Sequence, residues 1–163
     1  MDLLLLLQER ARTFPREQFI ASTPGLYLAV TARSQKAPIS FRTTTLDQEA
    51  KAPQLDLTDL EIVPLAKAPE NPYPDRISIG RAPNCDIVLR FASVSKLHGH
   101  FRRLDRERAE LVDLGSQNGT SVNGRRLTPN DPQRVLCGDI ILFGGITAQI
   151  IDADRLFYFF QRG

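Results

Sequence analysis

From Leu60 onward, short apolar or alternating segments alternate with turn residues, and this pattern restricts the fold more than any other feature. Nine of them follow residue 60: Leu60–Leu65, Arg76–Ile79, Ile87–Leu89, Gly99–Leu104, Glu110–Leu114, Thr120–Val122, Arg134–Leu136, Ile140–Phe143 and Thr147–Ile151. Such segments have the length of β-strands, and the 11 Pro and 10 Gly of the chain stand mainly between them. About nine strands in one region predict an all-β sandwich or barrel.

One hairpin is indicated by its turn. Asn123-Gly124 stands between Thr120–Val122 and Arg125–Leu127. Asn and Gly tolerate the positive φ angles of a type I′ turn, which joins two antiparallel strands with the correct twist. The sequence therefore predicts a tight β-hairpin at residues 120–127.

The N-terminal part has a different pattern. An amphipathic helix is expected from Asp2 to about Arg12, and a second short helical stretch begins at Pro15. Two extended segments follow, Leu26–Thr31 and Ile39–Leu46, and the charged residues 47–59 have the composition of a linker. We therefore expect residues 1–59 to form a small α/β extension.

The end of the chain is rich in aromatic residues. Leu156, Phe157, Phe159 and Phe160 lie close together with few charges, which predicts a terminal helix packed on the sandwich. The expected organisation is an N-terminal extension (1–59), a β-sandwich domain (60–152) and a C-terminal helix (153–163).

Charge and composition exclude several classes of protein. The 21 Lys and Arg balance 19 Asp and Glu and form no polybasic run, which argues against a dedicated nucleic-acid binder. The five leucines Leu3 to Leu7 are too few for a membrane span. Cys85 and Cys137 lack the spacing of a disulfide framework or zinc site, so we expect two buried thiols in a reducing, cytoplasmic environment.

Catalytic and metal-binding motifs find little support. His98 and His100 are two residues apart, which on a strand puts both on one face, but no third metal ligand is evident. Ser93-Val94-Ser95-Lys96 fits an S-x-x-K pattern without the companion motifs of that chemistry. We therefore expect no enzymatic activity, no metal and no cofactor.

Polar residues in three inter-strand segments form a set of hydrogen-bond donors. These segments are Gly80-Arg81, Ser95-Lys96-Leu97-His98 and Ser116-Gln117-Asn118-Gly119-Thr120. Between Arg76 and Arg103, six Lys or Arg stand against the single acid Asp86. A guanidinium, a hydroxyl, an ammonium and an amide are suited to a phosphate monoester, which carries two charges and three acceptor oxygens. Without a general base, this set would bind a phosphate without hydrolysing it.

The same residues carry a resemblance to a known family. Residues 76–124 contain Arg-Ile-Ser-Ile-Gly-Arg, Ser-Val-Ser-Lys-Leu-His and Asn-Gly-Thr-Ser-Val-Asn-Gly in this order, and this arrangement resembles a forkhead-associated (FHA) domain. The resemblance covers roughly Leu60 to Asp152. It implies a β-sandwich of about eleven strands that binds phosphothreonine peptides through loops at one end.

The resemblance also implies roles for individual residues. Arg81 is expected to pair with the phosphate, Ser95 to donate its hydroxyl to it, and Lys96 to add a further donor. Asn118 is expected to bond the main chain of the peptide beside phosphothreonine. Gln117 falls where a neighbouring residue can touch the phosphate.

A second group is implied to be structural. His98 is expected to hold the loop that presents Ser95. Gly80, Gly119, Asn123 and Gly124 are expected to provide backbone geometry.

Three hypotheses follow. The first is a phosphothreonine-dependent adaptor that acts beside a Ser/Thr protein kinase, and the second is a structural or assembly protein whose phosphate pocket is unused. The third, a small hydrolase that uses Ser95 and His98, conflicts with their roles in the Ser-x-x-His pattern. In addition, Thr43, Thr44 and Thr45 offer a phosphorylation site for binding in cis, although a β-strand is the simpler interpretation.

Overall fold

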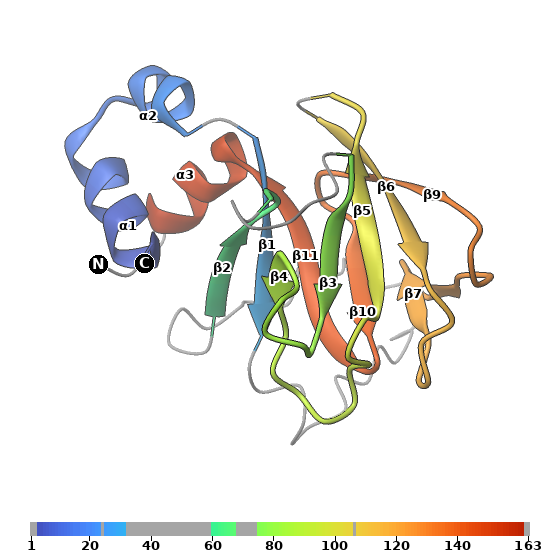
Figure 1. Cartoon of the computed structure of the whole chain (residues 1–163). Coiled ribbons are helices and arrows are strands. Elements are labelled where there is room, and N and C mark those ends of the chain that lie inside the picture. Colours follow the sequence, from blue (N-terminus) through green and yellow to red (C-terminus); the bar gives the residue numbers. More distant parts are fainter. Residues whose placement is uncertain (1–2, 24, 32–59, 68–74, 106, 162–163) are drawn as a thin grey trace, which may run out of the picture.

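Two β-sheets pack face to face, and three helices lie beside one of them (Figure 1). The computed structural model describes residues 3–23, 25–31, 60–67, 75–105 and 107–161. Within these residues, one sheet has six strands in the order β2-β1-β11-β10-β7-β8, and the other has five in the order β4-β3-β5-β6-β9. The expected all-β sandwich of about eleven strands is confirmed.

The elements follow the sequence pattern closely. The helices are α1 (Leu3–Thr13), α2 (Arg16–Ser22) and α3 (Ala153–Gln161). The strands are β1 (Leu26–Thr31), β2 (Leu60–Pro64), β3 (Ile77–Gly80), β4 (Ile87–Val88), β5 (Gly99–Arg103), β6 (Arg108–Asp113), β7 (Thr120–Val122), β8 (Arg125–Arg126), β9 (Gln133–Leu136), β10 (Ile140–Phe143) and β11 (Ile146–Asp152). The strand pairs are antiparallel except β3 with β4.

Alternate residues of facing strands fill the space between the sheets. Phe101 of β5 and Phe143 of β10 are fully buried and meet edge to face, with ring centroids 6.1 Å apart. Ile79, Leu111 and Ile141 extend the same core toward both sheets. This rigid core fixes the ends of β3, β5 and β6, from which the loops described below emerge.

Strand β1 corrects the expected domain boundary at residue 59. It lies between β2 and β11, with Leu28 opposite Val63 on one side and Ile150 on the other. All six of its residues are buried, because Leu28 and its alternate neighbours face the sandwich core while Tyr27 and Ala29 face the helices. The sandwich therefore begins with β1, inside the segment expected to form an N-terminal extension. Strand pairing depends on a partner far away in sequence, which local patterns do not reveal.

The three helices form a second apolar cluster on the outer face of β1 and its neighbours. Leu7 of α1, Phe19 of α2, and Leu156 and Phe160 of α3 pack there together with Tyr27. The expected opening helix and docked terminal helix are both present, and the terminal helix contacts the other two helices as well as the sheet. None of the described helices has the length and apolar character needed to cross a membrane.

The predicted hairpin is confirmed. Asn123 and Gly124 have φ angles of 51° and 82°, and Val122 pairs with Arg125 across the turn. The Asn123 side chain also donates to Asp139 Oδ1 at 3.0 Å and accepts from the N–H of Ile140 at 3.0 Å. This residue therefore joins the hairpin to the turn before β10.

The remaining expectations have mixed outcomes. Both cysteines are free thiols, but only Cys85 is buried, since Cys137 lies in the turn between β9 and β10 and is partly exposed. The expected strand Ile39–Leu46, the linker 47–59 and the threonines Thr43 to Thr45 lie outside the described residues.

Candidate functional site

Three loops meet at one end of the sandwich, the lower end in Figure 1. They connect β3 to β4, β4 to β5, and β6 to β7, and the turn between β10 and β11 packs against them. All five residues expected to contact a phosphopeptide lie in these loops. The residues are Arg81, Ser95, Lys96, Gln117 and Asn118.

Arg81 begins the loop after β3 and is held in place by the loop after β4. Its backbone N–H donates to the carbonyl of Ser95 at 2.9 Å, and its Nε donates to the carbonyl of Val94 at 3.0 Å. The side chain is exposed, and its two Nη groups have no partner among the described residues. A guanidinium fixed through Nε in this way can present both Nη groups to an anion.

Gly80 permits this close approach of the two loops. A Cβ atom added at Gly80 would lie 2.3 Å from the carbonyl oxygen of Lys96 and 3.0 Å from the backbone nitrogen of His98. Both of these atoms belong to the backbone and cannot move aside cheaply. Any larger residue would therefore push apart the loops that carry Arg81 and Ser95.

Ser95 connects the second loop to the third. Its Oγ accepts a hydrogen bond from the backbone N–H of Gln117 at 3.0 Å. The hydroxyl hydrogen has no acceptor among the described residues, so the hydroxyl can still donate to a ligand. The side chain of Gln117 is exposed beside it.

Asn118 is anchored to the same loop. Its Nδ2 donates to the carbonyl of Ser93 at 2.8 Å, whereas its Oδ1 has no hydrogen-bond donor among the described residues. The oxygen is therefore available to accept from an N–H group of a bound chain. The carbonyl of Ser93 also lies 2.2 Å from where a Cβ of Gly144 would stand, so the β10–β11 turn closes against this point.

Lys96 contributes its backbone to the loop and its side chain to the surface. Its carbonyl accepts from the backbone N–H of Ala82 at 3.0 Å and from the Sγ of Cys85 at 3.4 Å. The exposed side chain follows Ser95 directly.

His98 lies buried beneath the three loops. Its Nδ1 accepts from the backbone N–H of Ser95 at 3.2 Å, so the ring proton resides on Nε2. Nε2 then donates toward the carbonyl of Gly119 at 3.1 Å and the Oγ1 of Thr120 at 3.0 Å. Burial lowers the pKa of His98, although the nearby carboxylate of Asp113 opposes this shift. The neutral imidazole therefore connects the second loop to the third.

Asp113 and Thr120 complete this network, and the sequence interpretation assigned neither a role. Thr120 Oγ1 donates to Asp113 Oδ1 at 2.8 Å, and Ser116 Oγ donates to the same oxygen. The backbone N–H groups of Gly115 and Ser116 donate to Oδ2. Burial alone would raise the pKa of Asp113, but these hydrogen bonds outweigh burial and hold it below its usual value. The order Asp-x-Gly-Ser, typical of a turn closed by an Asp side chain, was the available signal.

Residues 77–144 match the family model described as the FHA domain. The chain contains an FHA domain. Human mediator of DNA damage checkpoint protein 1 is 32% identical over 110 residues, which are 64% of this chain and 5% of that protein. The oxoglutarate dehydrogenase inhibitor of Corynebacterium diphtheriae is 38% identical over 76 residues, which are 47% of this chain and 50% of that protein. The chain thus spans a small part of the first relative and half of the second.

A solved structure shares the fold. The crystal structure of the FHA domain of the CT664 protein from Chlamydia trachomatis has a TM-score of 0.53 at 19% identity, covering 78% of this chain and 96% of that one. This similarity covers more of the chain than residues 77–144.

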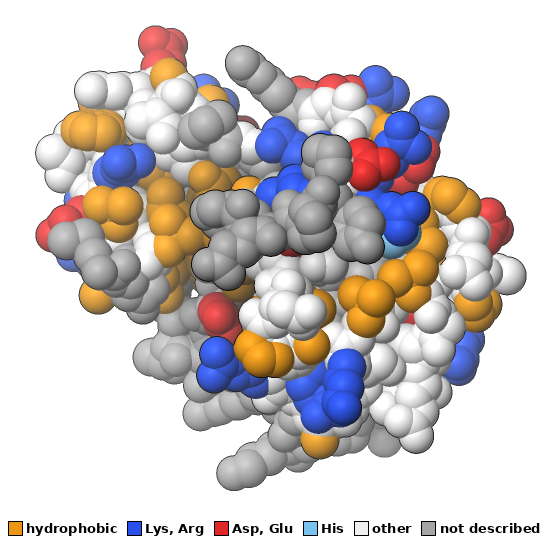
Figure 2. Space-filling view, in the orientation of Figure 1, with side chains coloured by type: hydrophobic (Ala, Val, Ile, Leu, Met, Phe, Trp, Pro, Cys, Tyr) orange, Lys and Arg blue, Asp and Glu red, His pale blue; other side chains and the backbone are white. Residues whose placement is uncertain are grey.

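Three basic residues, Arg81, Arg90 and Lys96, lie in the loops after β3 and β4 of the FHA domain. The carboxylate of Asp86 is bound to Ser78, because its Oδ2 accepts from the backbone N–H at 2.8 Å and from the hydroxyl at 3.1 Å. Of the six basic residues counted between Arg76 and Arg103, those at 76, 102 and 103 lie at the opposite ends of β3 and β5. Figure 2 shows Lys and Arg in several separate groups on this face, one of them at its lower end over the loops after β3 and β4.

The hydrogen bonds of His98 argue against a role for it as a base toward Ser95. Nδ1 of His98 accepts a hydrogen bond from the backbone N–H of Ser95 and not from its hydroxyl. Nε2 donates toward the carbonyl of Gly119. His98 is therefore not arranged to take a proton from Ser95 Oγ. No cluster of three His, Cys, Asp or Glu suited to a metal exists within the described part of the chain.

Proposed function

We propose that the chain is a phosphothreonine-dependent binding module for proteins or peptides. The observation that carries this proposal is the meeting of Arg81, Ser95 and Asn118 at one end of the FHA domain, each anchored through one polar atom and open through another. Because the anchors are made within the protein, few side-chain rotamers need to be ordered when a ligand binds.

The donors match the chemistry of a phosphate group. The two Nη groups of Arg81 can form a forked contact with two phosphate oxygens, while the Ser95 hydroxyl can donate to one of them. Lys96 adds a cation beside them, and Gln117 adds an exposed amide. A phosphate monoester carries roughly −1.5 to −2 charges near neutral pH and three acceptor oxygens.

Asn118 supplies recognition of the peptide itself. Its free Oδ1 can accept a backbone N–H group of the ligand while Nδ2 keeps the side chain fixed to Ser93. This contact depends on the main chain and not on the ligand's sequence, so it suits a module that binds many phosphorylated partners.

We further propose that the protein is not an enzyme and that it acts in the cytoplasm beside a Ser/Thr protein kinase. A binding role agrees with the occupied imidazole of His98. Free thiols at Cys85 and Cys137 suit a reducing compartment. A kinase is the required source of phosphothreonine.

The test is calorimetric titration with a degenerate phosphothreonine peptide library and the same library dephosphorylated. We expect micromolar affinity for the phosphorylated library only. A phosphoserine library tests whether the threonine methyl group contributes. Equal binding of phosphorylated and dephosphorylated peptides would favour the alternative of an assembly module whose phosphate pocket is unused.

A further inference from the structure

A small hollow lies beside Asn118, on the outer face of the six-stranded sheet. It has a volume of about 240 Å³, and its walls include Asn118, Gly119, Ser121, Arg126, Leu142 and Gly145. These residues come from the β6–β7 loop, the β7–β8 hairpin and the end of β10 with its turn. Asn118 therefore belongs both to the proposed peptide site and to this hollow.

Arg126 is packed against the backbone of the neighbouring loop. A Cβ atom at Gly119 would lie 2.7 Å from Arg126 Nη2 and 2.9 Å from Cζ, so the guanidinium covers the Cα of Gly119. Gly119 has a φ of 81°, and its carbonyl accepts a hydrogen bond from the backbone N–H of Gly144 at 3.0 Å. The absence of a side chain at Gly119 thus allows the guanidinium to lie next to Asn118.

The positive charge of Arg126 is not neutralised within the described residues. Arg16 and Arg108 each form an ion pair at 2.6 Å, with Asp154 and Asp105, whereas Arg126 forms none. The other walls of the hollow are uncharged. An exposed hollow with a single unpaired guanidinium favours an anionic group.

The hollow lies where a bound peptide would continue past Asn118. The phosphate donors Arg81 and Ser95 lie on the β3–β4 and β4–β5 loops, and Asn118 lies between them and Arg126. A peptide anchored by its phosphate and by its main chain at Asn118 therefore brings a nearby side chain to the hollow.

We infer that Arg126 selects phosphopeptides with an anionic side chain, that of Asp, Glu or a second phosphorylated residue, a few positions from the phosphothreonine. The inference rests on the proposed function, because the phosphate and Asn118 place the peptide. It assigns sequence preference to a residue of β8, outside the loops that hold the phosphate.

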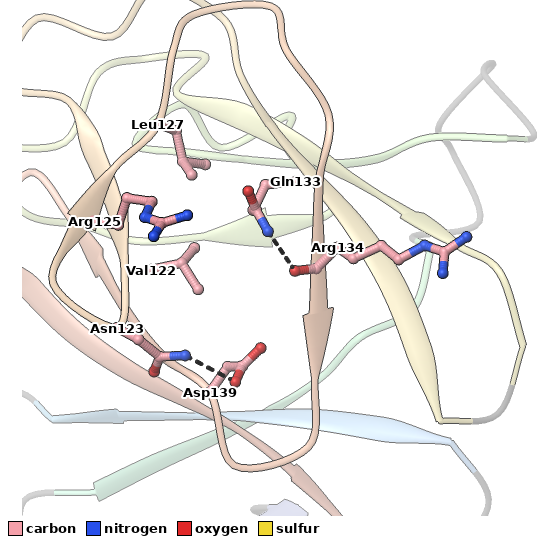
Figure 3. A pocket seen from close by; sticks show the side chains of 7 residues that line it. All are labelled: Val122, Asn123, Arg125, Leu127, Gln133, Arg134 and Asp139. Atoms are coloured by element: carbon pink, nitrogen blue, oxygen red, sulfur yellow. Dashed lines mark hydrogen bonds between the residues drawn. The ribbon is translucent and has the colours of Figure 1, made fainter.

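Arg125 provides a matched control. Consecutive residues of a strand point to opposite faces, and Arg125 lines a different hollow of about 310 Å³ between the hairpin and β9. Figure 3 shows its side chain directed toward Gln133, while Asn123 and Asp139 close the lower wall. The two variants Arg125→Gln and Arg126→Gln remove the same charge from adjacent positions.

The experiment is a titration of single phosphothreonine peptides in an Ala/Gly background, each with one Asp at a position from four residues before to four after the phosphothreonine. A parallel series carries phosphoserine in place of Asp. We expect wild-type affinity to rise about two- to tenfold at one or two adjacent positions. Arg126→Gln abolishes this gain without changing affinity for the neutral phosphopeptide, and Arg125→Gln keeps it. The Arg126→Glu variant is expected to prefer Lys at the same position.

Each contrary outcome has a defined meaning. If wild type binds the neutral phosphopeptide but shows no gain with any acidic residue, the inference is overturned and the proposed function stands. The same holds if Arg126→Gln keeps the gain, or weakens all phosphopeptides equally. If wild type binds none of the phosphopeptides, the proposed function fails and the inference fails with it.

Discussion

Nδ1 of the buried His98 accepts a hydrogen bond from the backbone N–H of Ser95 at 3.2 Å. The bond exists only while Nδ1 is unprotonated, because a protonated imidazole offers two donors and no acceptor. Protonation would place two N–H groups against each other beneath the loop that presents the Ser95 hydroxyl. The conformation of the candidate site is thereby coupled to the charge of one histidine.

The first prediction is a loss of stability at mildly acidic pH. Burial lowers the pKa of His98 in the folded protein, so the unfolded chain binds a proton more readily than the folded one. The free energy of unfolding is therefore expected to be level above about pH 6.5 and to fall as the pH drops below it. Thermal unfolding between pH 8 and pH 5 measures this slope.

His100 needs a control in that measurement, because burial followed by the charge of Arg76 lowers its pKa as well. The His100→Asn variant removes this contribution, and part of the slope is expected to persist. An NMR titration in which the His98 ring has a pKa at or above about 6.5 would contradict the prediction.

The second prediction concerns removal of the His98 ring. In His98→Ala, the N–H of Ser95 and the groups around Gly119 and Thr120 lose their partner. We expect the free energy of unfolding to decrease by about 1–3 kcal/mol or more, because the cavity adds to the lost hydrogen bonds. Phosphopeptide affinity should decline with it. If His98→Ala has the melting temperature of wild type yet does not bind, His98 contacts the ligand directly.

The third prediction tests the phosphate contact. Arg81→Ala removes the guanidinium whose two Nη groups are open. Charge-assisted hydrogen bonds contribute about 1.5–3 kcal/mol each, so losing two is expected to weaken a micromolar complex toward millimolar. Calorimetry measures the affinity. Ser95→Ala should lose less, since it removes one hydroxyl donor and no charge.

Arg90→Ala is the matched control for this change. Arg90 is an exposed arginine in the neighbouring β4–β5 loop, without a hydrogen bond to a described residue. Its removal leaves the net charge equal to that of Arg81→Ala and should have little effect on affinity. Equal weakening by both variants would mean that Arg81 acts through general electrostatics and not through a forked contact.

The sequence predicted most of the strands because each strand has its own local pattern. Thr120–Val122 with Asn123-Gly124 specifies a hairpin within eight residues, and the structure has it. By contrast, the position of β1 depends on pairing with β2 and β11, which begin at residues 60 and 146. No local signal reports such a partner, so the sequence alone places β1 in an extension.

In the candidate site, too, some features can be predicted from the sequence and others depend on contacts made only in the folded chain. Arg81, Ser95 and Asn118 could be selected from the sequence because their order and spacing resemble a known family. The sequence predicts no role for Asp113, because its importance lies in donors that come together from several residues only after folding. The sequence predicts Arg126 as a hairpin residue but not its contact with Gly119, since that contact depends on how the hairpin packs beside the loop.

The fourth prediction concerns Asp113. Its two carboxylate oxygens accept from Thr120, from the Ser116 hydroxyl and from the N–H groups of Gly115 and Ser116. In Asp113→Asn one acceptor oxygen is replaced by an NH2 donor that faces other donors. We expect a loss of about 1.5–3 kcal/mol or more in the free energy of unfolding by urea, since hydrogen bonds to a charged group are lost.

The pH dependence of wild type gives a second measure of the same group. The pKa of Asp113 is lowered in the folded state, so its contribution is present above about pH 4 and is lost as the pH falls through the folded pKa. Asp105→Asn is the control, because Asp105 is exposed and bonds only its own turn and Arg108 among the described residues. Equal destabilisation by the two Asn variants would show that the buried network does not hold the loop.

The last prediction concerns the start of the sandwich. A fragment of residues 60–163 contains the whole segment expected to form the β-domain but lacks β1, which lies between β2 and β11. Its loss would leave the edge of β11 unpaired and expose Ile150, which packs in the core. We expect this fragment to lack a cooperative thermal transition and to aggregate. A separate peptide of residues 1–31 should restore folding by supplying the missing strand, as measured by circular dichroism on mixing. Cooperative unfolding of the fragment alone, at the temperature of the full chain, would mean that β1 is dispensable for folding of the sandwich.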